Sequence, residues 1–233
     1  YVETLMATYG GPDSPLAQQE LGAAWIQMAG QVFPQFSRGT HIRTLPGADT
    51  LKERLGGIDF GGVSPTALVA VGLDGGGRAW AFGEWYRHEA TLDQTVEAMA
   101  RGQAEWGVTR WIADPAGKAE IEKLRHAGFT VQAARHGNRL PLRVQLVGAR
   151  LNEGPGKLPG MYVTSECPNL IMELETLAWR RVKISGKMEE HPTNDFERGA
   201  PDHAFDALAN VLAEWDAAAV PYKRPSGRVE LYA

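Results

Sequence analysis

The feature that most constrains the fold is a change in hydrophobic period near residue 90. Before it, three apolar runs cover residues 55–60, 66–73 and 79–86, and short glycine-containing turns separate them. Runs of this length between such turns predict β-strands. Because the connections are too short for a crossover helix, we expect the three strands to form an antiparallel meander.

After residue 90, segments of helical period alternate with short strand-like runs. An amphipathic helix over 92–103 is predicted to be capped by Thr91 and ended at Gly107. Residues 182–199 are predicted to be a polar loop or hairpin. The same reasoning predicts further strands at 110–113, 130–134 and 161–164, and helices at 118–126, 142–151, 169–181 and 201–216. This order predicts an α/β, RNase H-like fold of the RuvC and resolvase kind, with a mixed central sheet flanked by helices.

The pattern divides the chain into one domain and two flanking segments. Residues 51–220 hold the predicted sheet and helices. Residues 1–50 are predicted to be a linker with a docked helix near 18–28, leading in from an absent domain, and Tyr1 in place of Met favours a fragment of a longer protein. Residues 221–233 are predicted to be a tail, in which 229–232 could add an edge strand.

Composition excludes several classes of site. Cys167 is the only cysteine, which excludes disulfides and cysteine-based zinc sites and suits a reducing cytoplasm. The histidines show no H-E-x-x-H spacing, no apolar run is long enough to span a membrane, and no signal-peptide pattern opens the chain. The net charge of −4 argues mildly against a dedicated nucleic-acid-binding module, although an enzyme with an acidic site can still carry local basic rims.

Two aspartates stand where predicted strands end. Asp59 lies in an apolar strand, where a carboxylate is costly unless a metal ion or other partner compensates for its lost hydration. Asp114 follows the strand at 110–113, at the edge of an α/β sheet that ligands favour. The alternatives are that Asp59 bonds the turn that follows it and that Asp114 caps the next helix.

Further acids open the last predicted helix. Asp202 and Asp206 lie four residues apart and are predicted to share a helix face, and His203 is a candidate metal ligand beside them. Two acids in a first helical turn also complement the helix dipole, which is the alternative explanation. Together with Asp59 and Asp114, they favour phosphodiester hydrolysis with two Mg²⁺ or Mn²⁺ ions about 3.5–4 Å apart.

Taken in order, these motifs resemble the C-terminal nuclease domain of the large terminase subunits of tailed phages. The matching pieces are GIDFG at 57–61, ADPAGK at 113–118 and DHAFDAL at 202–208. Upstream, QEL at 19–21 and GQVF at 30–33 are similar to the family's passage from its ATPase to its nuclease domain. The resemblance extends from about residue 17 to 216, and the third motif is the most specific.

The resemblance implies a metal-dependent endonuclease that cuts double-stranded viral DNA, with little sequence specificity, during genome packaging. It implies that Asp59, Asp114 and Asp202 are catalytic metal ligands, and it leaves open whether Asp202 or His203 provides the third ligand. Asp206 and Lys118 are weaker candidates for support. It also implies partners in the full-length protein, namely the ATPase domain, the small terminase subunit and the portal, and a location in the cytoplasm of the infected bacterial host without membrane attachment.

Basic residues predict where DNA would be held. One group precedes the polar segment at 188–199 and a second follows the strand after Asp114. For any single residue a solvated surface is the simpler explanation, but as groups they are the candidates for phosphate contacts. The first group is Arg180, Arg181, Lys183 and Lys187, and the second is Arg135, Arg139 and Arg143.

Other functions are less well supported by the sequence. A phosphate-binding G-x-x-x-x-G-K-[ST] motif is missing, so the chain is not expected to hydrolyse ATP. Actin-like ATPases and sugar kinases open with a similar strand, but they need late glycine pairs, and after residue 160 only Gly186, Gly199 and Gly227 occur. Junction resolvases and transposases share the fold and remain an alternative, as does a non-enzymatic module that clamps DNA.

Overall fold

The computed structural model describes residues 30–135, 139–152, 158–183 and 190–216. Its centre is a six-stranded sheet with the strand order β5-β4-β1-β2-β3-β6. The meander β1 (Leu51–Asp59), β2 (Thr66–Asp74) and β3 (Ala79–Arg87) is antiparallel, as predicted. On its two sides, β4 (Arg110–Ala113) runs parallel to β1 and β6 (Met161–Val163) runs parallel to β3, while β5 (Val131–Ala133) continues beside β4. The predicted mixed α/β sheet is thereby confirmed.

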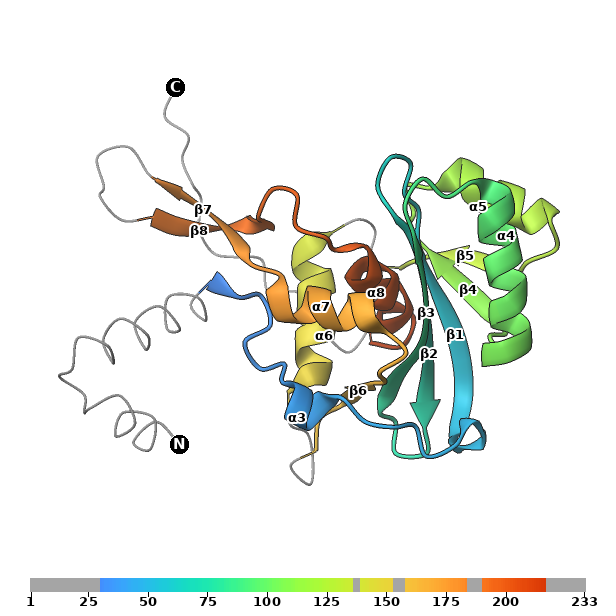
Figure 1. Cartoon of the computed structure of the whole chain (residues 1–233), viewed down its shortest axis with the longest axis horizontal. Helices are drawn as coiled ribbons and strands as arrows, with labels where there is room; N and C mark the ends of the chain where they lie inside the picture. The colour runs from blue at the N-terminus through green and yellow to red at the C-terminus, as the bar shows by residue number, and fades with distance from the viewer. Residues whose placement is uncertain (1–29, 136–138, 153–157, 184–189, 217–233) are drawn as a thin grey trace.

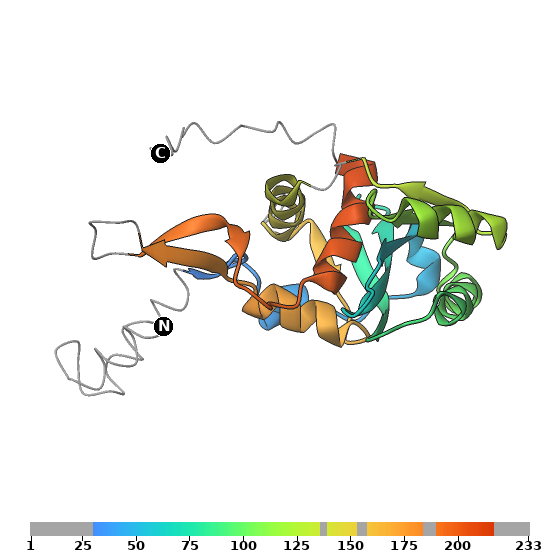
Figure 2. The same ribbon diagram turned by 90° about the horizontal axis from the view of Figure 1, so that it is seen from above.

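Helices cover both faces of this sheet (Figures 1 and 2). One face carries α4 (Leu92–Arg101), which continues into the π-helical turn η2 (Gly102–Trp106), and α5 (Lys118–His126). The other carries α6 (Leu140–Leu151), α7 (Pro168–Thr176) and α8 (His203–Asp216). Because helices cover both faces, β2 is buried over residues 66–72, which explains its continuous apolar sequence.

The last helix is seated directly on the central strand β1. A Cβ atom at Gly57 would lie only 1.8 Å from the carbonyl oxygen of Ala207, so glycine allows the close approach. Farther along α8, the amide of Asn210 donates a hydrogen bond to the carbonyl oxygen of Ile58 (2.8 Å). These contacts position the start of α8 against the end of β1.

The segment after α7 corrects one prediction. The helix predicted at 169–181 ends at Thr176, and Leu177 adopts an extended conformation with ψ of 124°. Residues of β7 (Trp179–Lys183) then pair with β8 (Glu190–Phe196) in a hairpin that projects from the domain (Figure 2). Packing of Trp179 on Phe196, with ring centroids 5.6 Å apart, favours the strand, because it joins two aromatic rings that a helix would separate.

Element ends elsewhere differ from the predictions by a few residues. β1 begins at Leu51 rather than 55, because Leu51 to Leu55 also pair with β2. α6 begins at Leu140 rather than 142. α8 begins at His203, so that Pro201 and Asp202 precede the helix.

Part of the segment predicted to be a linker belongs to the core. Val32, Phe33 and Phe36 are buried, and the ring of Phe33 lies 5.5 Å from that of Phe205 in α8. Two short helical segments follow, α3 (Arg38–His41) and η1 (Ala48–Thr50). The helix predicted near 18–28 and the tail at 221–233 lie outside the described residues. Among the residues that are described, no helix is both long and apolar enough to cross a membrane.

Candidate functional site

The ends of β1 and β4 place two carboxylates at the same edge of the sheet. The strands are parallel, with Ile58 opposite Ala113, and the backbone N–H of Asp114 donates to the carbonyl oxygen of Ile58 (3.3 Å). Side chains alternate along a strand, and Gly57 faces α8. Asp59 therefore lies on the α8 side, whereas Asp114 follows the last residue of β4 and lines a cavity on the α4 and α5 side.

The start of α8 adds two further polar groups beside Asp59. The His203 ring is hydrogen-bonded through Nδ1 to Oδ2 of Asp59 at 2.8 Å, and Asp59 is only 8% exposed. This hydrogen bond raises the pKa of His203. Burial raises the pKa of Asp202, the charge of His203 opposes the shift, and the nearby Asp59 carboxylate adds to it. Asp59, Asp202 and His203 thus form one electrostatically coupled group.

Asp114 occupies the turn between β4 and α5. Its Oδ1 accepts a hydrogen bond from the backbone N–H of Ala116 (2.8 Å), so the turn-forming role weighed for it from the sequence is present. This bond engages one carboxylate oxygen. We refer to Asp59, Asp114, Asp202 and His203 together as the carboxylate site.

Asp206 has a different environment from Asp202. It is buried between α8 and α6 and forms an ion pair with Arg143, which is only 8% exposed. Burial raises the pKa of Asp206 to about 8, Arg143 opposes the shift, and Asp202 and Asp59 add to it. Asp202 and Asp206 were predicted to share a helix face, but their surroundings differ. Asp202 lies beside Asp59, whereas Asp206 belongs to an internal ion pair. Arg143, predicted to contact DNA, instead points into the protein.

The donors of the carboxylate site suit a divalent metal ion. In the described part of the chain, no three His, Cys, Asp or Glu side chains are already grouped closely enough to hold a metal ion. The fit comes from chemistry: carboxylate oxygens are the ligands that Mg²⁺ and Mn²⁺ prefer. Burial raises the pKa of Asp202 most and the Asp59 carboxylate adds to the shift, and a bound cation would offset both the burial of these charges and their repulsion.

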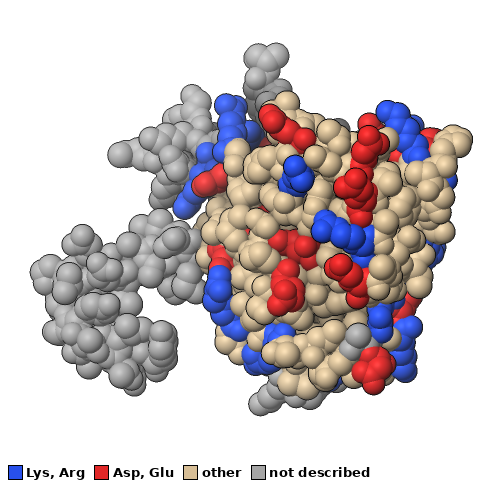
Figure 3. Space-filling model, turned by 45° about the vertical axis from the view of Figure 1, so that its right-hand side comes forward, with Lys and Arg blue, Asp and Glu red and all other residues tan. Residues whose placement is uncertain are grey.

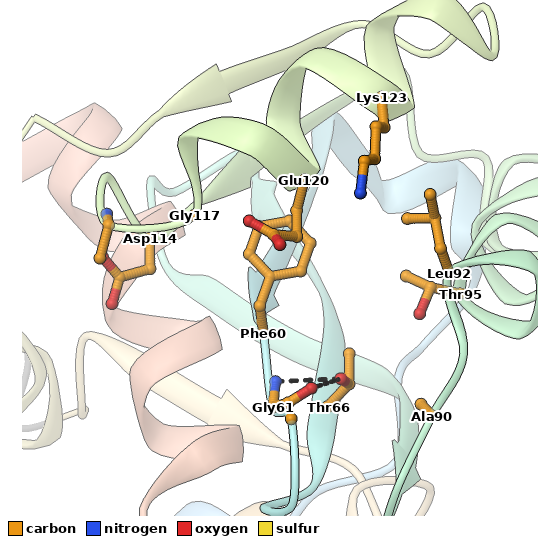
Figure 4. A pocket seen from close by; sticks show the side chains of 12 residues that line it. Phe60, Gly61, Thr66, Ala90, Leu92, Thr95, Asp114, Gly117, Glu120 and Lys123 are labelled. Carbon is orange, nitrogen blue, oxygen red and sulfur yellow. Dashed lines mark hydrogen bonds between the residues drawn. The ribbon is translucent and has the colours of Figure 1, made fainter.

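Two cavities open beside this site. One of about 420 Å³ has Asp114 in its wall and lies between β1, α4 and α5, with Phe60 on one side and Leu92 and Thr95 on the other (Figure 4). The second, of about 480 Å³, includes Asp202 and His203 together with Tyr86 and residues of α7. Asp114 therefore borders a cavity on the α4 and α5 side of the sheet, and Asp202 and His203 border one on the α7 side.

Solved structures of several phage proteins share the fold of this chain. Neither a protein-family model nor a curated protein matches the sequence. The large terminase of a thermophilic bacteriophage superposes with a TM-score of 0.63 and 20% identity, over 80% of this chain and 45% of that one. The nuclease domain of the SPP1 large terminase, solved with bound Mn, gives 0.56 and 22% over 75% of this chain and 93% of that one, and the P22 nuclease domain gives 0.56 and 18% over 80% and 92%.

The chain has the fold of a large-terminase nuclease domain. At these identities the likeness establishes the fold, and it confirms the fold class that the motifs implied. The chain spans less than half the length of the thermophilic phage's large terminase but most of the length of the SPP1 and P22 nuclease domains.

In this terminase-type fold, a buried acid that the sequence analysis missed holds the start of α8. Glu173 of α7 is fully buried, and its Oε2 accepts a hydrogen bond from the backbone N–H of Phe205 (2.7 Å). Its Oε1 accepts one from the hydroxyl of Tyr86 (3.1 Å). Burial raises the pKa of Glu173 to about 7, against these hydrogen bonds. The available signal was an acid among the apolar positions of α7, where Leu170, Ile171 and Leu174 are buried.

The basic residues predicted to contact DNA are dispersed. Arg180 pairs with Asp195 across the hairpin (3.0 Å), and Arg181 is exposed on the same strand. Lys183 ends β7, and Lys187 lies outside the described residues. Lys118 at the start of α5 and Arg139 before α6 are exposed, and Arg135 pairs with Glu214 (3.1 Å). On the face shown in Figure 3, acidic and basic side chains are interspersed rather than gathered in one broad basic patch.

Proposed function

We propose that this chain is the nuclease domain of a phage large terminase and cuts double-stranded DNA during genome packaging. The observation that carries the proposal is the coupled group of Asp59, Asp202 and His203, at the edge of a sheet with the fold of terminase nuclease domains. Asp114 follows the adjacent parallel strand, at the same edge of the sheet. The proposal therefore has three parts: the chain belongs to a large terminase, it cuts DNA, and it acts with the partners named below.

The proposed cofactors are two Mg²⁺ or Mn²⁺ ions, with Asp59, Asp114 and Asp202 as ligands. The SPP1 domain of the same fold binds Mn, which supports a divalent metal for this chain. Such ions would supply a metal-activated hydroxide and stabilise the leaving oxygen. His203 is better placed to orient Asp59 than to take the place of Asp202 as the third ligand, because its Nδ1 is already engaged with the Asp59 carboxylate. Lys118 remains a weaker candidate for contact with substrate phosphate.

The proposed substrate is duplex DNA with little sequence preference, because phosphate contacts carry no base information. The ATPase domain, the small terminase subunit and the portal are the proposed partners of the full-length protein, in the cytoplasm of an infected bacterium. The large terminase of the thermophilic phage is more than twice as long as its matching part, which leaves room for such a further domain in a full-length homologue.

Plasmid cleavage tests this function. With millimolar Mn²⁺ or Mg²⁺, supercoiled plasmid should be converted to nicked and linear forms, and chelation should stop the reaction. Asp59→Asn and Asp202→Asn should each reduce the rate by at least about a hundredfold, the scale of losing one transition-state stabilising group. Asp93→Asn is the matched control, because Asp93 is an exposed acid in the first turn of α4 and is not one of the carboxylate-site residues. Cleavage by Asp59→Asn at the wild-type rate would refute the assignment.

A further inference from the structure

The loop between β1 and β2, residues 60–65, begins directly after Asp59 and projects beyond the end of the sheet (Figure 1). Val63 near its middle is 87% exposed. The other large hydrophobic side chain that is exposed among the described residues is Leu158, at 45%. A single exposed valine is ordinary on a protein surface, so its exposure indicates a function only if its surroundings support one.

The base of this loop is held firmly. The Thr66 hydroxyl accepts a hydrogen bond from the backbone N–H of Gly61 (3.0 Å) and donates one to its carbonyl oxygen (3.2 Å; Figure 4). Thr66 is only 2% exposed. A Cβ at Gly61 would lie 2.1 Å from the carbonyl oxygen of Ser64, so the loop folds tightly back on itself. Val63 is therefore presented on a braced turn.

The same loop separates the two cavities. Gly61 and Gly62 line the cavity that contains Asp114, whereas Ser64 and Pro65 line the one that contains Asp202. Each cavity also has an aromatic ring in its wall, Phe60 in the first and Tyr86 in the second. The exposed valine thus stands between two hollows, each with one proposed catalytic carboxylate.

The chemistry of the loop suits the interior of a base stack. Residues 60–66 contain no charged side chain, so the loop offers no cation to a phosphate, and its most exposed large side chain is the apolar Val63. Proteins that kink DNA insert apolar side chains between base steps, and aromatic rings offer surfaces on which displaced bases can stack. Building on the proposed function, we propose that Val63 is a wedge that enters duplex DNA at the cut site and parts neighbouring bases, which the flanking cavities receive.

The wedge is tested by comparing two substrates that differ only in pairing. One is a short duplex, and the other is the same duplex with a two-base mismatch at its centre. Val63→Ser should cut the paired duplex at least about tenfold more slowly than wild type, equivalent to about 1.4 kcal/mol. On the mismatched duplex its rate should lie within about twofold of wild type, because those bases are already partly unstacked. Val63→Leu, which keeps an apolar tip, should retain wild-type rates on both.

A binding measurement separates failure of the wedge from failure of the nuclease assignment. Without metal, wild-type protein should increase the fluorescence of a duplex carrying 2-aminopurine, which brightens when unstacked, and Val63→Ser should not. Equal losses by Val63→Ser on paired and mismatched DNA, or no loss on either, would overturn the wedge. Wild-type protein that brightens 2-aminopurine but cuts no DNA would support the wedge and overturn the nuclease.

Discussion

At the scale of single residues, two acids four positions apart at the start of α8 have opposite environments. Asp202 faces Asp59 at the carboxylate site, whereas Asp206 is enclosed with Arg143. Desolvation acts on both, but an arginine is ion-paired with only one of them. Asp206 has its compensating cation within the protein, whereas Asp202 is the acid that we propose as a metal ligand.

The Arg143–Asp206 pair gives a prediction about stability. Arg143→Met removes the cation that favours the ionised form of Asp206 and should lower the free energy of unfolding by about 3 kcal/mol near about pH 10, where that carboxylate is ionised beside Arg143. The loss should be smaller near about pH 5, where the protonated acid needs no cation. The double variant Arg143→Met, Asp206→Asn should recover at least half of the loss in denaturant titrations. A loss below about 1 kcal/mol near about pH 10 would show that the pair contributes little.

Glu173 should make stability depend on pH in a defined direction. Its pKa rises from 4.5 to about 7 on folding, so the folded state binds the proton more tightly than the unfolded state. The resulting stabilisation is complete below about pH 4.5 and is lost as pH rises through about 7, with a slope of up to about 1.4 kcal/mol per pH unit.

Glu173→Gln should remove the contribution of Glu173 to the pH dependence of the free energy of unfolding. The glutamine keeps an acceptor for the Phe205 N–H and can donate its amide to the Tyr86 hydroxyl, so the fold should persist. Unfolding by urea at several pH values without metal measures the effect, and Glu175→Gln on the outer side of α7 serves as the control. An unchanged slope in Glu173→Gln would mean that this acid does not titrate in the expected range.

At the scale of elements, the hairpin β7–β8 carries one part of the predicted DNA contacts away from the core. Arg143 is withdrawn into the core, and Arg135 is paired with Glu214. Arg181 and Lys183 lie on a strand that projects from the domain. A projecting hairpin can reach along a duplex whose scissile phosphate lies at the sheet edge, because it is not confined to the globular surface.

Reversal of charge on the hairpin tests this interaction. Arg181→Glu together with Lys183→Glu should weaken DNA binding and reduce the slope of log K against log salt by about 0.9 for each phosphate that the protein no longer neutralises. Binding of Mn²⁺ should be unaffected, because neither residue belongs to the carboxylate site. Fluorescence anisotropy over a range of salt concentrations measures the affinity and its slope. Unaltered affinity and slope would direct attention to the exposed Arg139 instead.

At the scale of the whole molecule, metal binding should couple to folding. The carboxylate site draws Asp59, Asp114 and the residues before and at the start of α8 from separate parts of the chain, so an ion held there links β1, β4 and α8. A ligand that binds only the folded state adds about 2.7 kcal/mol at a hundredfold excess over Kd. For a domain of this size, that corresponds to a rise in Tm of roughly 5–10 °C.

Thermal unfolding with and without millimolar Mn²⁺ measures this coupling. Mn²⁺ should raise Tm more than Mg²⁺ at equal concentration, following their order of affinity for mixed ligands. Asp59→Asn should abolish most of the shift, whereas Asp93→Asn should keep it. A wild-type Tm that is insensitive to millimolar Mn²⁺ would argue against the proposed metal site.

The sequence by itself determined the elements and their order. Apolar runs bounded by glycine predicted β1 to β3, and the caps and periods around Thr91 and Gly128 predicted α4 and α5, because these signals depend on neighbours along the chain. The motif around residues 202–208 implied a fold that the solved nuclease domains share. Local signals were enough to predict these helices and strands, because each signal lies within a few residues of the element that it predicts.

The tertiary structure decided which polar groups meet. The helix predicted to continue to residue 181 is replaced by a strand from Trp179 onward, because Trp179 packs on Phe196 across the hairpin. Arg143 was expected at the surface but is buried, because α6 packs beside Asp206 on α8. Glu173 of α7 accepts a hydrogen bond from the backbone of α8, which no local pattern predicted. Burial and charge pairing depend on residues that are distant in sequence, so no local pattern assigns them. The close seating of α8 on Gly57 brings His203 to Asp59, and packing alone set that distance.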